Sequence, residues 1–363
     1  MQPRAAASPA TPTRRLRAAL SWLHLWVGLV AGTVFALAGL SGSVLVFHSD
    51  LLQWQHPQLA AQAPVSEPAV LAGVLHEWTP RGLSAIDFPR ESMPAWQAYF
   101  KDGSRRYFAT GDGALLLTRT VGDDPLLWLH EFHVELLAGE AGHQVLGVVG
   151  WLALGLLVTG VYLWWPRFGP WSTHLKVYRG PPVRRWLSWH RTSGLVLLPL
   201  LLVVTLTGVG MVYHDGARAL LTGLFGGAPS PAAPVRAARN EAPPDWPRVL
   251  ATARDALPGA TLVRTSLPAP GSEVVGFRVR LPGEWHPNGR SLVSVDAPGT
   301  TVLLAHDATR QALGARIDET VYPLHIGAVG GRPYRWAVAL AGLVPAFLLV
   351  TGFLFWRRRR GLR

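Results

Sequence analysis

Long apolar runs interrupt an otherwise polar chain at four places. Each continues for about 20 residues or more without Asp, Glu or Lys, which is enough for a helix to cross roughly 30 Å of hydrocarbon. The runs are Trp22–Phe47, Val145–Trp165, Trp189–Tyr213 and Trp336–Trp356. Only Arg191, near one end of the third run, breaks the pattern. The sequence therefore predicts four membrane-spanning helices.

The two long segments between these runs show a different pattern, in which a short helix precedes four strand-like stretches. In the first segment the helix is expected at 67–78 and the strands at 84–88, 95–100, 105–110 and 114–118. In the second segment the helix is expected at 245–256 and the strands at 260–267, 273–281, 291–296 and 301–306. Each segment predicts a small α+β module. Residues 226–244, rich in Ala, Pro and Gly, predict a flexible approach to the second module.

The two halves of the chain carry matching residues at matching spacings. The first and third apolar runs pair His24 with His190, Gly28 with Gly194 and His48 with His214. The second and fourth runs match in the same way, because His133 precedes Thr159-Gly160 by the distance at which His325 precedes Thr351-Gly352. These matches predict a duplicated helix–module–helix unit, a usual construction for membrane proteins.

The predicted fold is therefore an α-helical membrane protein with four transmembrane helices and two small α+β modules on the outer side. Its expected segments are a cytoplasmic N-terminus at 1–20, transmembrane helices at 21–48, 126–166, 187–214 and 323–356, modules at 49–125 and 215–322, a cytoplasmic loop at 167–186 and a basic cytoplasmic tail at 357–363. The helices at 126–166 and 323–356 each include a lead-in on the outer side.

Basic residues set the expected direction of these helices. The formal net charge is +12, yet Arg and Lys crowd beside helix ends rather than along one polar face, which argues against a nucleic-acid-binding surface. They gather before the first run, between the second and third, and after the fourth, for example at 14–17, 184–185 and 357–360. Since cytoplasmic loops are enriched in Arg and Lys, both termini are expected to be cytoplasmic.

Histidines near the ends of the apolar runs are the candidate functional residues. An ionisable side chain in a bilayer is costly and is a functional candidate by default, although a lone histidine at a helix end is more often an ordinary interfacial residue. Six histidines recur in register across the duplication, and they are His24, His190, His48, His214, His133 and His325. They form two layers, with His24 and His190 near the cytoplasmic side and the other four near the outer side.

Paired imidazoles between helices are suited to haem b, and two layers of them imply two haems. The chain has no Cys, which excludes thiolate metal sites, iron–sulfur clusters and covalent CxxCH haem attachment. No other histidine competes with His24 and His190 at their depth, whereas the outer layer offers four ligands where one haem needs two. His143, Arg191 and Arg335 are further candidates for haem contact, and lipid phosphates are an alternative partner for the two arginines.

Each apolar run also contains a hydroxyl residue followed by Gly. The pairs are Ser41-Gly42, Thr159-Gly160, Thr207-Gly208 and Thr351-Gly352. Small residues allow either a neighbouring helix or a flat ligand to approach closely. The sequence leaves both roles open.

Four stretches of the chain resemble a known family, the PepSY-associated transmembrane proteins, which include PiuB-like proteins and inner-membrane siderophore reductases. The stretches are WLHLWVGL at 22–29, FHVELLAGEAGHQVLG at 132–147, LSWHRTSGLVLLP at 187–199 and YPLHIGAVGGRPYR at 322–335. The resemblance covers essentially the whole chain. It implies periplasmic modules of the PepSY type and a bacterial inner-membrane protein that carries two haem b groups.

The resemblance also implies an activity, which is oxidoreductase transfer of electrons to the periplasmic side to reduce ferric iron in ferric-siderophore complexes. The histidines of the family fall on His24, His133, His190 and His325, with His48 and His214 as additions. No GxGxxG nucleotide fingerprint follows a predicted strand, so the electrons are expected to come from quinol or from a separate cytoplasmic reductase.

A second hypothesis is a non-enzymatic membrane protein whose PepSY-like modules bind or regulate an envelope peptidase or another partner, because PepSY relatives include peptidase inhibitors. That hypothesis leaves the in-register histidines without a purpose. A metal transporter would place polar groups near the bilayer midplane, whereas these histidines lie near the ends of the runs. The leading hypothesis is therefore a haem-binding ferric reductase, with membrane lipid rather than nucleic acid around it.

Overall fold

The computed structural model describes residues 12–63, 67–166, 169–227, 231, 234 and 243–361. The start of the expected N-terminal segment and most of the expected approach at 226–244 lie outside the described residues. The chain divides into two compact units. The helical unit comprises Met1–Val44, Phe132–Val212 and Trp336–Arg363, and the sheet unit comprises Leu45–Glu131 and Tyr213–Arg335.

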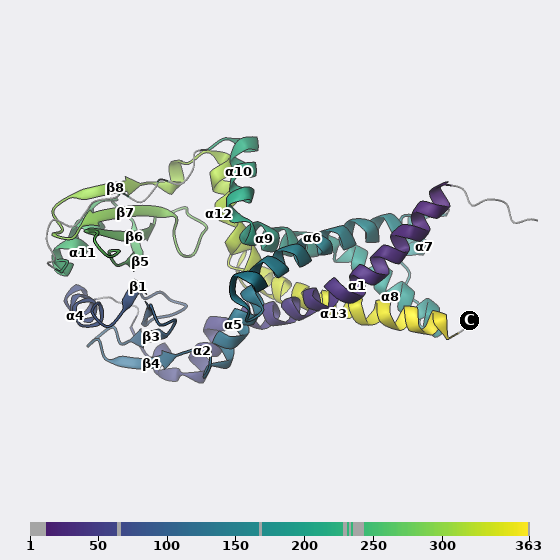
Figure 1. Cartoon of the computed structure of the whole chain (residues 1–363), viewed down its shortest axis with the longest axis horizontal. Helices are drawn as coiled ribbons and strands as arrows, with labels where there is room; N and C mark the ends of the chain where they lie inside the picture. Colours follow the sequence, from purple (N-terminus) through teal and green to yellow (C-terminus); the bar gives the residue numbers. More distant parts are fainter. Residues whose placement is uncertain are drawn as a thin grey trace, which may run out of the picture. The chain divides into compact units, whose positions relative to one another are not determined.

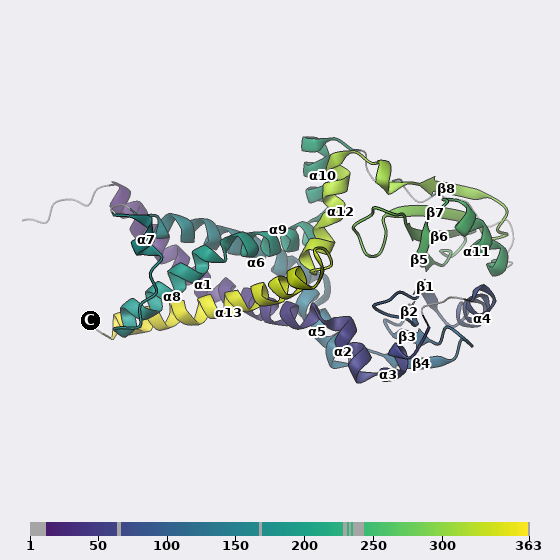
Figure 2. The same ribbon diagram turned by 180° about the vertical axis from the view of Figure 1, so that it is seen from behind.

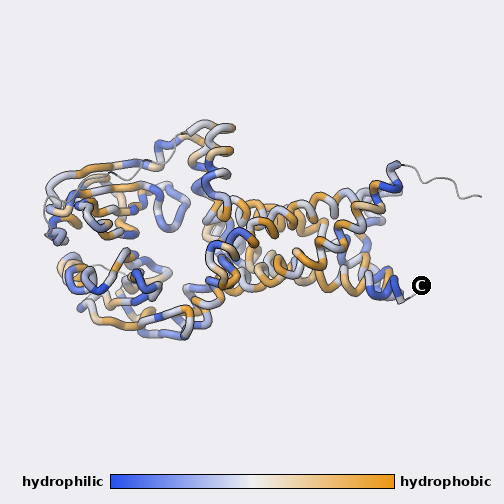
Figure 3. Tube along the Cα trace, viewed as in Figure 1, coloured by the Kyte–Doolittle hydropathy of each residue, from blue (hydrophilic) through white to orange (hydrophobic). Residues whose placement is uncertain are grey.

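Within the described residues, three helices are long and apolar enough to cross a membrane. They are α1 (Pro12–Leu45), α6 (Gly139–Trp164) and α13 (Gly331–Arg360), which run beside one another in Figures 1 and 2. A fourth crossing is reached if α8 (Pro182–Val196) and α9 (Leu198–Val212) count as one span. Apolar residues dominate the middle of these helices (Figure 3). The protein is therefore a membrane protein with three or four spans.

The third apolar run is a bent pair of helices rather than the single helix that the sequence predicts. α8 and α9 meet at an angle of 65°. Pro199 lies in the first turn of α9, where its missing N–H is tolerated. A continuous helix would need that N–H to bond to the carbonyl of Leu195, and the proline ring would clash with this carbonyl. Proline chemistry thus explains the break.

All eight strands that the sequence predicts are present among the described residues, and the two expected modules share them in one antiparallel sheet. The strands are β1 (Leu83–Asp87), β2 (Trp96–Phe100), β3 (Arg105–Phe108), β4 (Leu115–Arg119), β5 (Thr261–Ser266), β6 (Val274–Arg280), β7 (Ser291–Asp296) and β8 (Val302–His306). Their order is β4-β3-β2-β1-β5-β6-β7-β8. The first module therefore joins the second through the antiparallel pair β1 and β5.

Two helices cover one face of this sheet. α4 (Pro68–Trp78) and α11 (Trp246–Asp255) contribute to the main hydrophobic core together with strand residues that alternate along each strand. In β6, for example, Val275, Phe277 and Val279 are buried in the core, whereas Arg278 between them is only partly buried. Because successive side chains of a strand point to opposite faces, Arg278 belongs to the face that α4 and α11 leave uncovered.

Shorter helices complete the sheet unit. A second core lies between α2 (His48–Gln55), α3 (Pro57–Ala60), the start of α5 (Pro125–Glu135), the segment before β2, and strands β3 and β4. Its largest buried side chain is Tyr107, packed with Leu52, Leu59 and Leu126. On the other side of the sheet unit, α10 (His214–Phe225) packs against α12 (Leu313–His325).

Candidate functional site

A cavity of about 640 Å³ lies inside the helical unit, and both inner histidines line it. That size is within the range of about 300–1,000 Å³ typical of small-molecule and cofactor sites. His24 comes from α1 and His190 from α8, so the duplication supplies equivalent residues from two helices. Leucine and aromatic side chains make up much of the remaining wall, together with the glycines Gly28, Gly32, Gly160, Gly194 and Gly352.

His24 is held by the hydroxyl–glycine pair of α6. Its Nδ1 lies 2.9 Å from Oγ1 of Thr159, and that hydroxyl donates its own hydrogen to the carbonyl of Gly155 at 2.7 Å. The Thr159 oxygen is therefore the acceptor and Nδ1 of His24 the donor. A side chain on Gly160 would place its first carbon 3.5 Å from Cε1 of the imidazole, an ordinary van der Waals contact, so Gly160 lies directly against the ring.

His190 is held in the same way by the equivalent pair of α13. Its Nδ1 lies 2.9 Å from the carbonyl of Leu348 and 3.4 Å from Oγ1 of Thr351. A carbonyl can only accept, so Nδ1 of His190 carries a proton. A side chain on Gly352 would come within 3.2 Å of the ring.

The third example is His133, from α5, which rests on Ser41-Gly42 of α1. Its Nδ1 lies 2.9 Å from the carbonyl of Ala38 and 3.0 Å from Oγ of Ser41. A side chain on Gly42 would place its first carbon only 2.8 Å from Cε1 of His133, closer than such carbons approach other atoms. The pairs Ser41-Gly42, Thr159-Gly160 and Thr351-Gly352 are thus seats for an imidazole, which gives one role to a motif whose role the sequence leaves open.

The seats fix the chemistry of the imidazoles. Anchoring Nδ1 as a donor sets the tautomer and leaves Nε2 as the nitrogen with a free lone pair. Metal-binding histidines almost always donate their other ring N–H to a carbonyl or a similar acceptor, which fixes the ring orientation. His24, His190 and His133 all show this arrangement, each on a different hydroxyl–glycine pair.

The separation of the two inner histidines would allow both to bind one metal ion. Their ring centres lie 6.3 Å apart with the planes at 89°. Because an imidazole nitrogen lies about 2 Å from a bound transition metal and about 1.1 Å from its own ring centre, two imidazoles on opposite sides of one ion place their centres about 6.2 Å apart. Within the described residues no group of three or more His, Cys, Asp or Glu could hold a metal. A porphyrin, which needs only axial ligands from the protein, fits this donor set.

Basic side chains line the same cavity. They are Arg14, Arg17, Arg191 and Arg359. Arg17 donates to the carbonyl of Leu163, and Arg191 donates to the carbonyl of Trp164 at 3.2 Å and to Nδ1 of His174 at 3.1 Å. The sequence singled out Arg191 but missed the other three. For Arg17 the spacing could have predicted this position, because Arg17 precedes His24 by two helical turns and so lies on the same face of the helix.

The remaining outer histidines lie in different surroundings. His48 begins α2 in the sheet unit, and its Nε2 is buried without a hydrogen-bond partner among the described residues. His214 begins α10 and faces two carboxylates, with Nδ1 3.4 Å from Asp215 and Nε2 3.6 Å from Asp318. The structure therefore places His48 and His214 with different partners, whereas the duplication made them equivalent.

The last candidates lie on the segments that lead into α6 and α13. His325 is in the final turn of α12, in the sheet unit. His143 is in the first turns of α6, with Nδ1 3.1 Å from the carbonyl of Val134. Arg335 forms an ion pair with Asp50, donates to the carbonyl of Val46 at 3.0 Å, and lies over the ring of Phe47 at 4.7 Å. That guanidinium already has protein partners at the start of α13.

Comparison with known proteins identifies the family of this chain. A search of curated proteins gave no match. The family model of the PepSY-associated TM region matches residues 21–359, nearly the whole chain, and confirms the resemblance seen in the sequence. The chain therefore belongs to the PepSY-associated TM family.

Proposed function

We propose that this protein is a di-haem electron carrier of the bacterial inner membrane that reduces ferric iron, in ferric-siderophore complexes, on the periplasmic side. The observation that carries the proposal is the pair His24 and His190, whose ring centres lie 6.3 Å apart in a cavity of about 640 Å³. Both rings are anchored through Nδ1. These two residues are the proposed axial ligands of the inner haem.

The outer haem is proposed from the duplication. His133 has a seat of the same construction as the inner histidines, and His325 is its counterpart in the sequence repeat. We take α8 and α9 as one broken span, which gives four crossings and puts both termini on the cytoplasmic side. This topology agrees with the gathering of Arg residues at the start of α1 and the end of α13.

Haem b between two imidazoles supplies one-electron transfer between its ferrous and ferric states. The residues of this chain hold and insulate that group. The leucine and aromatic wall of the inner cavity would surround the group with apolar side chains, and Arg17 and Arg191 would offset its negative charge. Reducing a bound ferric ion needs little acid–base machinery, so no catalytic triad is required. The electron donor is proposed to be quinol or a separate cytoplasmic reductase.

Anaerobic spectroscopy tests the proposal. Purified protein should show the sharp reduced-minus-oxidised bands of low-spin haem b, and dithionite-reduced protein should be reoxidised when a ferric siderophore is added. His24→Ala should remove the inner haem, whereas His76→Ala, at an exposed position of α4, should leave the spectrum unchanged. A reduced protein that stays reduced in the presence of ferric siderophores would reject the reductase activity.

A further inference from the structure

A row of charged side chains crosses the uncovered face of the sheet. Asp87 of β1 is paired with Arg264 of β5, and Arg264 is in turn paired with Arg278 of β6. Like charges directly opposite each other on neighbouring strands destabilise a sheet. The pairing of Arg264 with Arg278 is such a contact, at the centre of the sheet unit. Because this pair of arginines does not help the sheet to fold, a functional reason for it is expected.

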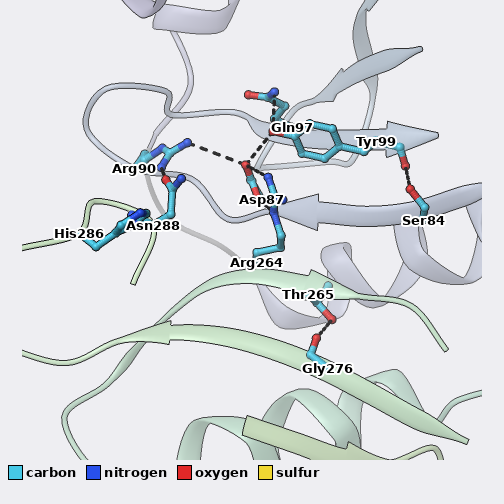
Figure 4. A network of polar contacts seen from close by, with 10 residues as sticks. All are labelled: Ser84, Asp87, Arg90, Gln97, Tyr99, Arg264, Thr265, Gly276, His286 and Asn288. Atoms are coloured by element: carbon cyan, nitrogen blue, oxygen red, sulfur yellow. Dashed lines mark hydrogen bonds and ion pairs between the residues drawn. The ribbon is translucent and has the colours of Figure 1, made fainter. Parts of the chain in front are cut away.

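One side of this row is fully paired. Arg264 donates to both carboxylate oxygens of Asp87, at 2.5 and 3.0 Å, and the hydroxyl of Tyr99 donates to Asp87 at 3.0 Å. Arg90 donates to Oδ1 of Asn288 at 2.5 Å and lies 3.8 Å from Asp87 (Figure 4). The positive charge of Arg264 is therefore compensated by its ion pair with Asp87.

The other side of the row has two arginines without a counter-ion. Among the residues that the structure describes, the guanidinium groups of Arg278 and Arg290 have neither a hydrogen bond nor an ion pair, and Nε of Arg290 is buried. Both side chains are only partly accessible. Burial lowers the pKa of both arginines. The guanidinium groups of Arg290 and Arg264 lower the pKa of Arg278 further, whereas Glu319 and Asp318 oppose the shift at Arg290 and Arg218 adds to it. Two desolvated cations thus lie next to each other unpaired.

The nearby carboxylates are engaged elsewhere. Asp318 accepts from Arg218 at 2.9 Å. Glu284 accepts from the backbone N–H groups of Leu281 and Arg290 and from the hydroxyl of Ser291. These contacts fix the loop between β6 and β7 but leave the Arg290 guanidinium without a carboxylate at ion-pair distance in the described residues.

In the described part of the chain, Glu319 is the nearby carboxyl group without such a contact, and it lies close enough to Arg290 to raise the pKa of that guanidinium. Burial raises its pKa to about 7, so it is partly protonated near neutral pH. It therefore cannot balance both Arg278 and Arg290. An anion from solution can.

We propose that Arg278 and Arg290 bind the carboxylate groups of an anionic ferric chelate. Guanidinium groups match the geometry of a carboxylate through paired N–H donors. Beside these arginines the buried imidazole of His286 stacks on the ring of Tyr322, with ring centres 5.0 Å apart. The assignment rests on the proposed ferric reductase function, because that function makes the anion a substrate.

Calorimetric titration of the oxidised full chain in detergent tests this site without redox chemistry. Gallium(III) citrate serves as a redox-inert, carboxylate-rich probe, and a gallium(III) trihydroxamate without free carboxylates serves as the comparison. We expect the citrate complex to bind more tightly, and Arg278→Gln or Arg290→Gln to weaken it at least about tenfold, as expected for loss of a charged hydrogen bond. Arg254→Gln, at an exposed position on the other face of the sheet, should bind like wild type.

Three results would overturn the inference. The first is equal binding of the two gallium complexes. The second is binding of inorganic phosphate, or of phosphatidylglycerol in nanodiscs, as tightly as the citrate complex with the same dependence on Arg278, since either would identify a general phosphate or lipid site. The third is unchanged citrate binding in variants whose melting temperature equals that of wild type.

Haem content measured on the same preparations separates this inference from the proposed function. Haem-loaded protein that fails to bind the citrate complex rejects the chelate site alone. Haem-free protein rejects the electron carrier, and Arg278-dependent citrate binding in that protein would still support the anion site.

Discussion

Gly42 of α1 and His133 of α5 are in direct contact, so closely that a methyl group on the glycine would lie 2.8 Å from Cε1 of the imidazole. The neighbouring Ser41 hydroxyl lies 3.0 Å from Nδ1 of the same ring. Gly42 allows the His133 ring to lie against α1, and the Ser41 hydroxyl fixes the orientation of that ring. His190 lies on Thr351-Gly352 in a similar way, with 3.2 Å between the ring and the position of an added carbon on the glycine. His24 contacts Thr159-Gly160 at 3.5 Å, so there the hydroxyl supplies the specific contact.

Gly42→Ala should therefore displace His133 and lower the haem content of the purified protein by about half, because loss of a group that orients a metal ligand typically costs about 10- to 100-fold in affinity. Gly155→Ala is the matched control, since nothing lies within 4 Å of the position that its side chain would take. Haem is measured as the pyridine haemochrome per mole of protein. Full haem occupancy in Gly42→Ala would show that the seat is dispensable.

Thr159→Val should raise the midpoint potential of the inner haem more than Thr351→Val. His24 depends on the Thr159 hydroxyl at 2.9 Å, whereas His190 keeps the Leu348 carbonyl at 2.9 Å when Thr351 is lost. A hydrogen bond accepted from Nδ1–H makes an imidazole a stronger donor and favours ferric iron, and about 1 kcal/mol corresponds to about 40 mV for one electron. Spectroelectrochemical titration measures both variants, and equal shifts would contradict the assignment of the acceptors.

Asp87→Asn should destabilise the sheet unit by about 2 kcal/mol or more. The Asp87 side chain is 7% exposed and pairs with Arg264 across the join of the two modules, and removing one partner of a buried pair leaves the other charge uncompensated. Glu77→Gln is the comparison, because its pair with Arg81 is more than half exposed and should contribute less than about 1 kcal/mol. Chemical denaturation of the full chain in detergent, followed by circular dichroism, compares them. Equal stabilities would show that the join does not depend on this pair.

Glu319 should make the sheet unit less stable as the pH rises from about 4.5 to about 7. Burial raises its pKa from 4.5 to about 7 in the folded protein, while Arg290 and Arg218 oppose this shift and Glu284 and Asp318 add to it. The folded state then holds a proton that the unfolded state releases, so stability falls with rising pH in this window. Because water still reaches the half-buried carboxyl, the loss should be about 1–2 kcal/mol.

Glu319→Gln should remove this dependence. Its melting temperature at pH 8 should exceed that of wild type, and the two proteins should melt together near pH 4.5. Parallel melting curves for the two proteins across the whole range would contradict a raised pKa at Glu319.

Hydrophobic and polar patterning predicted the elements of this fold well. All eight strands were expected close to where they lie, because alternation of apolar and polar residues reports a sheet with one covered face. Pairing between β1 and β5 could not be predicted, since it depends on contacts between residues such as Asp87 and Arg264 that are far apart in the chain. The bend at Pro199 was readable in principle from proline chemistry.

The site residues that could be predicted from the sequence were those that recur at equivalent positions in the two halves of the chain. Register alone picked out His24 and His190, which the structure brings together. The hydroxyl–glycine pairs were noticed as a repeated motif, but their function as imidazole seats needed the helix packing. Arg278 and Arg290 escaped notice because their distinguishing property, the lack of a counter-ion among the described residues, exists only in the folded sheet.

The most direct test of the central claim is the haem content of wild type, His24→Ala and His190→Ala, purified in the same way and measured per mole of folded chain. We predict that each variant loses the same inner haem, about half of the total, and that the double variant loses no more than either single one. Full occupancy in both single variants, or wild-type protein that binds no haem after reconstitution with haemin, would contradict the account.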